Sequence, residues 1–143
     1  MNRLAISLLG MALALSVCAS AAFADPSLYD RLGGEKAVTA VVDEFVARVA
    51  TDPRINHFFS STNVPAFKKK LVDQIGQASG GPQIYHGLNM KKAHEGLHVS
   101  DQDFDALVED LVGALDKFKV PEREKKELLG ILGPMRPEVT DSK

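Results

Sequence analysis

Apolar residues recur three and four positions apart along most of the chain, and this spacing restricts the fold more than any other feature. The clearest stripe comprises Phe104, Leu107, Val108, Leu111, Leu115 and Phe118. Such spacing places side chains on one face of an α-helix. Similar stripes predict two long helices over about residues 35–50 and 64–79 and a third that starts at Pro121 and is ended by Pro134 and Pro137. Short helices are expected at residues 25–32, after residues 51–53 and near residues 90–96. The sequence therefore predicts an all-α domain with no convincing strand.

The first residues are typical of an export signal. A positive start at Arg3 precedes an apolar run from Leu4 to Val17, and Ala22-Phe23-Ala24 fits a signal-peptidase site. We predict that residues 1–24 are a cleaved signal peptide, that residues 25–143 form one domain, and that the protein is exported, to the periplasm in a Gram-negative host. A retained membrane helix is the alternative, but the run is too short to span a bilayer comfortably. We therefore expect no membrane association after cleavage.

Cysteine content and charge exclude several functions. The single cysteine, Cys18, lies in the removed segment, so the mature protein has no disulfide and no Cys-x-x-Cys-His heme attachment. A lipid anchor at Cys18 is a further alternative, which the bulky Val17 disfavours. The formal net charge is −2 and the only basic run is Lys68-Lys69-Lys70, which does not favour a nucleic-acid partner.

One histidine lies on an apolar helical stripe. Met90, Ala93, His94 and Leu97 follow at i, i+3, i+4 and i+7. An imidazole that points inward needs a polar partner, and no Asp, Glu or Cys lies on this face. A metal such as heme iron would satisfy it. A core histidine held by hydrogen bonds is the alternative, and from the residues alone it is the commoner case.

Short motifs in a fixed order give the chain a family resemblance. They are Leu28-Tyr29-Asp30-Arg31-Leu32-Gly33-Gly34, Val42-Asp43-Glu44-Phe45, Asp52-Pro53-Arg54-Ile55, Phe58-Phe59, Gly80-Gly81-Pro82, Met90-Lys91-Lys92-Ala93-His94 and Val120-Pro121. Through them residues 27–140 resemble the group I (N-type) truncated globins. The resemblance implies a two-over-two helical sandwich around one noncovalent heme b, with His94 as the proximal iron ligand. The other ring N–H of such a ligand needs an acceptor, and we expect a backbone carbonyl.

The resemblance also assigns apolar side chains to the heme pocket. One of Phe58 and Phe59 is expected to pack against the porphyrin. The other expected wall residues are Phe45, Ile75, Met90, Leu97, Phe104 and Leu107. These side chains would suit a helical core without a cofactor as well. The hydroxyl of Tyr85 is expected either to reach a heme propionate or to have no such role, and His57, His86 and His98 are predicted to lie on the surface.

The distal side departs from the pattern of the resembling family. Many group I members have a tyrosine where this chain has Val46, and glutamine or another polar residue where it has Phe67 and Leu71. None of these three side chains can donate a hydrogen bond. Loss of one such bond to bound oxygen costs about 1–3 kcal/mol, or about 5- to 150-fold in affinity. We therefore predict weak or short-lived oxygen binding, with carbon monoxide and nitric oxide less affected.

Lys70 lies three residues after Phe67, at the edge of the distal face. Three roles remain open for it. It forms a salt bridge with a heme propionate, it binds iron as a sixth ligand through its neutral amine, as in some group I relatives, or it is solvated. Ligation requires the lysine to lose its proton first.

Two functions follow from the resemblance. The first is reversible binding of a diatomic gas (oxygen, nitric oxide or carbon monoxide), as in oxygen binding or transport. The alternative is a redox or nitric-oxide-detoxifying heme protein that has Lys70 as a switchable ligand and an unknown reductase partner. The apolar distal face and the lack of a flavin or nicotinamide domain count against the second, so a ligand-binding globin is favoured over an enzyme. A globin-shaped chain without heme is a third possibility.

Overall fold

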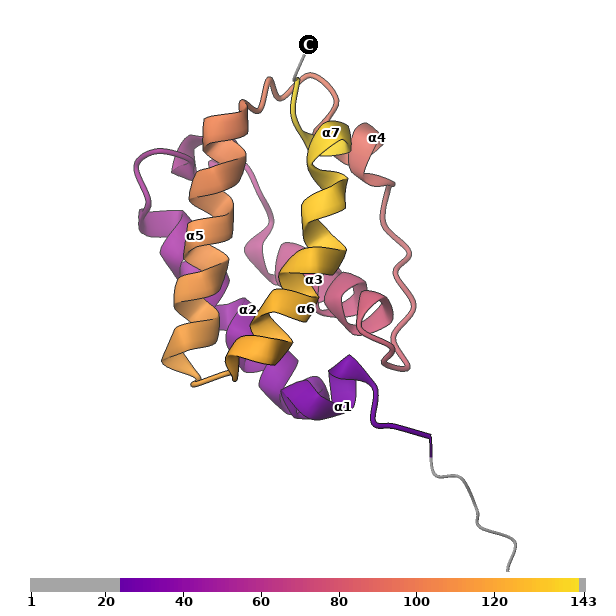
Figure 1. Cartoon of the computed structure of the whole chain (residues 1–143). Coiled ribbons are helices and arrows are strands. Elements are labelled where there is room, and N and C mark those ends of the chain that lie inside the picture. The colour runs from indigo at the N-terminus through magenta and orange to yellow at the C-terminus, as the bar shows by residue number, and fades with distance from the viewer. Residues whose placement is uncertain (1–23, 142–143) are drawn as a thin grey trace, which may run out of the picture.

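The computed structural model describes residues 24–141 and places nine helical segments and no strand in that range (Figure 1). They are α1 (Leu28–Leu32), α2 (Gly34–Thr51), the 3₁₀ helix η1 (Asn56–Phe59), α3 (Val64–Ala78), α4 (Met90–His94), α5 (Asp101–Lys117), α6 (Glu122–Leu132), the 3₁₀ helix η2 (Gly133–Met135) and α7 (Arg136–Val139). The all-α prediction is confirmed. The predicted signal peptide lies outside the described residues except for Ala24. Within residues 24–141 no helix is long and apolar enough to cross a membrane.

The long helix α2 is the centre of the packing, with α5 and α3 both packed against it. Its buried side chains follow the helical spacing that the sequence shows: Val38, Val41, Val42, Phe45, Val46 and Val49. From the other helices, Leu115 of α5 and Leu128 of α6 are almost completely buried in the same core. Burial of each large apolar side chain contributes about 1.5–3 kcal/mol, so this stripe accounts for the position of α2.

Side-chain caps fix where four of the helices begin. Ser27, Asn63, Asn89 and Ser100 each accept a hydrogen bond from a backbone N–H in the first turn of the helix that follows. Ser100 and Asp103 form a full capping box, which confirms the start predicted for α5. Each cap satisfies an N–H that has no partner within its helix.

The sequence predicts that helical structure ends at Pro134 and Pro137, but in the structure it continues past both prolines. α6 ends at Leu132, but Pro134 and Pro137 lie in the first turns of η2 and α7, so helical structure continues to Val139. Proline is tolerated there because an N–H in the first turn has no helical acceptor to lose. In Figure 1 these segments form one yellow column beside α5.

The helix α7 is tied to its neighbours at both ends. Arg136 forms ion pairs with Asp101 and Asp105 of α5, and its guanidinium lies 4.4 Å from the centre of the Phe104 ring. After α7, the backbone N–H of Asp141 donates to the carbonyl of Val99 at 2.9 Å. α7 also packs against α4.

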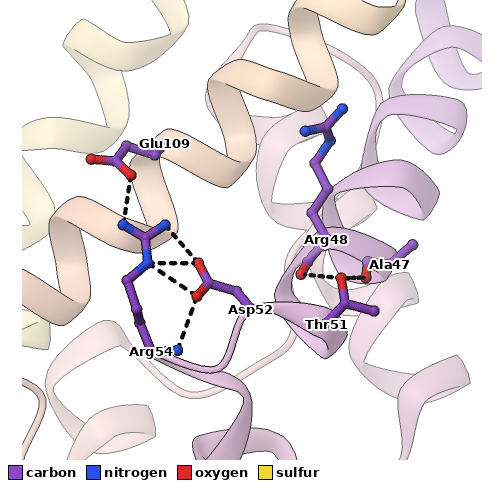
Figure 2. A network of polar contacts seen from close by, with 6 residues as sticks. All are labelled: Ala47, Arg48, Thr51, Asp52, Arg54 and Glu109. Carbon is purple, nitrogen blue, oxygen red and sulfur yellow. Dashed lines mark hydrogen bonds and ion pairs between the residues drawn. The ribbon is translucent and has the colours of Figure 1, made fainter.

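A carboxylate fixes the corner between α2 and η1 (Figure 2). Asp52, the C-terminal cap of α2, accepts hydrogen bonds from the backbone N–H and the guanidinium of Arg54, and Arg54 Nη1 reaches Glu109 of α5 at 2.7 Å. The hydrogen bonds from Arg54 lower the pKa of Asp52. Burial raises the pKa of the neighbouring Asp110, and the charge of Asp52 acts in the same direction. The corner positions η1, which carries Phe58 and Phe59.

Candidate functional site

His94 is the half-buried last residue of α4, and its ring is oriented by the backbone. The Nδ1 atom lies 2.7 Å from the carbonyl oxygen of Met90, one turn earlier. The expected backbone acceptor is therefore present. A carbonyl oxygen can only accept, so Nδ1 carries the proton and Nε2 is left as the basic nitrogen.

The apolar stripe around His94 is shorter than predicted. α4 ends at His94, and Leu97 lies beyond the helix with 42% of its surface exposed. The chain leaves the helical path at the C-cap Glu95, whose ψ is 125°, and Gly96 follows with a φ of 78°, in the left-handed region that glycine adopts readily. Leu97 therefore does not continue the helical face of His94.

Apart from Leu97, which belongs to neither, the predicted wall and distal residues fall into two apolar clusters. Met90, Phe104 and Phe58 belong to a cluster near α4 and α7, together with Val99 and Val139. The remaining wall residues belong to or pack against the main core: Phe45, Ile75, Phe59, Phe67, Leu71 and Leu107. Phe58 packs against both clusters. The cluster that contains Met90, the first residue of α4, thus draws on η1, α5 and α7, which are far apart in the sequence.

Two of the three predicted distal residues meet at one cavity. Val46 is 6% exposed, and with Phe59 and Phe67 it lines a cavity of about 370 Å³ between α2, η1 and the start of α3. The rings of Phe59 and Phe67 lie 5.3 Å apart. Leu71 does not line this cavity and packs against the core instead.

The same cavity has a polar edge that the sequence analysis missed. It comprises Asn56, His57, Ser60 and Thr62. These residues follow Val46 by 10 to 16 positions, and only the turn after α2 brings them back to it. No local motif in the sequence indicates that return.

The basic run on α3 is divided by its ion pairs. Lys68 pairs with Asp43 at 2.9 Å, and Lys69 pairs with Asp73 at 2.6 Å. Lys70 is exposed, and within the described part of the chain it has no ion-pair partner. Of the three lysines, Lys70 is therefore the one that is available to another group.

Tyr85 is engaged within its own loop. Its hydroxyl donates to the carbonyl oxygen of Leu88 at 2.7 Å, so its only proton is not directed at a propionate. The three other histidines, His57, His86 and His98, are exposed, as predicted. His98 Nδ1 lies 2.7 Å from a carboxylate oxygen of Asp141.

A single imidazole is a donor set that suits heme iron. A structural zinc ion takes four protein ligands, whereas heme iron takes most of its ligands from the macrocycle and one from a proximal histidine. Between residues 24 and 141 no three His, Cys, Asp or Glu side chains are grouped so that they could hold a metal ion. The donor that heme iron requires from the protein is one histidine, and His94 can supply it.

Comparisons with known proteins agree with this fold. The profile of the bacterial-like globin family matches residues 27–141. A group 1 truncated hemoglobin of Mycolicibacterium paratuberculosis is 37% identical over 113 residues, which cover 79% of this chain and 83% of that protein. The crystal structure of the truncated hemoglobin from Tetrahymena pyriformis in its Fe(III) form has a TM-score of 0.79 at 32% identity, over 82% of this chain and 100% of that one. A Synechococcus 2/2 hemoglobin in the cyanomet state with covalently attached heme has a TM-score of 0.77 at 33% identity, with the same coverage.

The helical sandwich and the histidine at the end of a short helix define a heme protein of the globin class. The chain belongs to the bacterial-like globin family, as a group 1 truncated hemoglobin. Membership implies heme and its iron as the cofactor.

Proposed function

We propose that this protein is an exported globin that holds one heme noncovalently through His94 and binds a diatomic gas reversibly. The observation that carries the proposal is the 2.7 Å contact between His94 Nδ1 and the Met90 carbonyl. In the neutral ring this contact places the proton on Nδ1, so the lone pair that can bind iron is on Nε2. When bound, heme supplies an iron atom that takes up oxygen, nitric oxide or carbon monoxide.

The remaining residues set the surroundings of that iron. Donation from Nδ1 to a carbonyl makes Nε2 a stronger electron donor. The cluster that contains Phe58, Met90 and Phe104 would form the apolar wall on the His94 side of the heme. On the other side, Val46 and Phe67 offer a gas no hydrogen bond, which supports weak or short-lived oxygen binding.

Absorption spectra of the purified protein with and without His94 test the proposal. We expect a Soret band in ferric and ferrous wild type and a shifted ferrous band with carbon monoxide. His94→Gly should lose its pigment, or show a normal spectrum only when imidazole is added. The matched variant His86→Gly, at an exposed histidine, should have the spectrum of wild type. A His94→Gly protein with full pigment and an unchanged iron–nitrogen stretch would show that another residue is the ligand.

Noncovalent attachment has its own test. The only cysteine of the chain is Cys18, so residues 25–143 offer no thiol for a thioether bond. Acidified butanone should therefore extract all pigment from the protein. Pigment that stays with the polypeptide would point to an attachment like that of the Synechococcus relative.

Export is tested by the mass of the protein that the host produces. Cleavage after Ala24 predicts a mature chain that begins at Asp25 in the periplasmic fraction. A full-length mass in the cytosol would contradict export.

A redox function with Lys70 as a switchable sixth ligand is the second candidate. One observation favours it: of the three lysines in the basic run, Lys70 is the one without an ion-pair partner in the described part of the chain. Ligation predicts a six-coordinate, low-spin ferric spectrum that becomes high-spin in Lys70→Ala but not in Lys69→Ala. Repeated turnover of nitric oxide with a reductase would then distinguish an enzyme from a reversible binder. A high-spin ferric spectrum of the wild-type protein would exclude Lys70 as an iron ligand. Lys70 would then either pair with a heme propionate or be solvated.

A further inference from the structure

Gln74 is a polar residue on the inward face of α3. Phe67, Leu71 and Gln74 follow at i, i+4 and i+7, and all three are half-buried. An amide among apolar side chains must find hydrogen-bond partners. Neither gas binding nor core packing accounts for this amide.

The amide of Gln74 meets two sulfur atoms. Its Nε2 atom donates to Met90 Sδ at 3.2 Å and lies 3.9 Å from Met135 Sδ. Met90 is the first residue of α4 and Met135 belongs to η2. Because thioether sulfur is a weak acceptor, the contact orients the Met90 side chain more than it stabilises the fold. It joins the helix of Phe67 and Leu71 to the helix that ends at His94.

Met90 is also the residue that holds the imidazole of His94. Its carbonyl oxygen lies 2.7 Å from His94 Nδ1, at the short end of the usual range for such bonds. α4 has five residues and none of them is buried. The side chain of Met90, held by Gln74 and by the cluster that contains Val99, Phe104 and Val139, therefore helps to fix where that carbonyl lies.

We propose that Gln74 is a positioning residue for His94 and acts through Met90. The inference rests on the proposed function, in which His94 binds heme iron. With Met90 held, the carbonyl stays close to Nδ1 and strengthens Nε2 as a donor. Without the amide, the first turn of α4 can shift, the hydrogen bond lengthens and the iron–nitrogen bond weakens.

A double-mutant cycle on the heme-loaded protein tests this role. Gln74→Met keeps the length and apolar packing of the side chain but removes the donor, and Met90→Leu removes the sulfur but keeps the carbonyl. We expect each variant to lower the iron–histidine stretching frequency of the ferrous protein in resonance Raman spectra. We also expect each to speed hemin transfer to a scavenger protein about tenfold, the lower end of the effect of outer-shell partners on metal affinity. Because both substitutions remove the same contact, the double variant should change the stretching frequency and the hemin transfer rate no more than the stronger single variant does.

The controls separate this role from simple destabilisation and from failure of the proposed function. Gln102→Met, at an exposed glutamine of α5, should leave both readouts unchanged. An unchanged stretch in Gln74→Met, or additive shifts in the double variant, would overturn the positioning role while His94 ligation stands. If the wild-type protein showed no iron–histidine stretching band that depends on His94, both the proposed function and the positioning role of Gln74 would be overturned. If Gln74→Met does not fold, Gln74→Glu replaces it, because at neutral pH its carboxylate has the same shape and no donor, and the same shift is expected.

Discussion

Val46 is the position at which the apolar distal side is best tested. Val46→Tyr introduces a hydroxyl at a site that is 6% exposed and borders the cavity of about 370 Å³. The added ring can enter this cavity instead of the close-packed core, so we expect the overpacking cost to stay near the lower end of about 1–3 kcal/mol. The matched control is Val46→Phe, which adds the same ring without a donor.

The size of the effect follows from one hydrogen bond. Donation from the tyrosine hydroxyl to oxygen in a pocket of low dielectric constant contributes about 1–3 kcal/mol, which slows oxygen dissociation about 5- to 150-fold. Carbon monoxide accumulates less negative charge, so its dissociation should change much less. Val46→Phe changes the shape of the pocket alone and should not slow oxygen release to this extent.

Stopped-flow displacement of oxygen by carbon monoxide measures the oxygen dissociation rate of wild type and both variants, and displacement of carbon monoxide by nitric oxide measures that of carbon monoxide. Equal rates in Val46→Tyr and Val46→Phe would refute the hydrogen-bond reasoning. Slow oxygen release in wild type would show that another side chain already donates. The polar edge of the cavity, beginning with Asn56, would then be the first place to look.

Three further predictions concern stability. Asp110→Asn should raise the thermal midpoint at pH 7, because burial and the charge of Asp52 raise the pKa of the Asp110 carboxyl and its ionised form costs stability. The gain should shrink as the pH falls below that raised pKa and vanish at the ordinary pKa of an aspartate; a gain in calorimetry that is constant across pH would contradict the cause. Ser100→Ala removes the capping box of α5 and should cost about 1 kcal/mol in urea unfolding, whereas Ser61→Ala at an exposed position should cost almost nothing. Leu115→Ala, at a fully buried residue of α5, should cost about 2–5 kcal/mol, and a smaller loss would mean that the core closes over the cavity.

Local patterns in the sequence predicted the helices well. The stripe from Val64 to Ala78 and the Gly80-Gly81 break gave α3 almost to the residue, and Ser100 gave the start of α5. Helical spacing, capping residues and glycine breaks each determine the backbone conformation within a few residues of their own position. The prolines misled the prediction for the C-terminal part, because whether a proline ends a helix or begins the next depends on the turn in which it lies.

The sequence predicted only the local part of the geometry at the candidate site. His94 and its need for a carbonyl partner follow from one helical turn, and Met90 supplies that partner. The ion pair of Arg54 with Glu109 joins residues 55 positions apart, and the contact of Gln74 with Met90 crosses from α3 to α4. Helical spacing alone indicates neither contact, because both depend on how the helices pack.

The C-terminal segment closes the side of the molecule on which His94 lies. Arg136 binds α5, α7 rests on α4, and Asp141 is bonded to Val99. A protease that clips the chain before Arg136 would thus open the proximal wall, and pigment loss would precede unfolding. A bulky tag fused close behind Asp141 would strain the same closure, so recombinant preparations with and without such a tag should be compared for heme content before any gas affinity is measured.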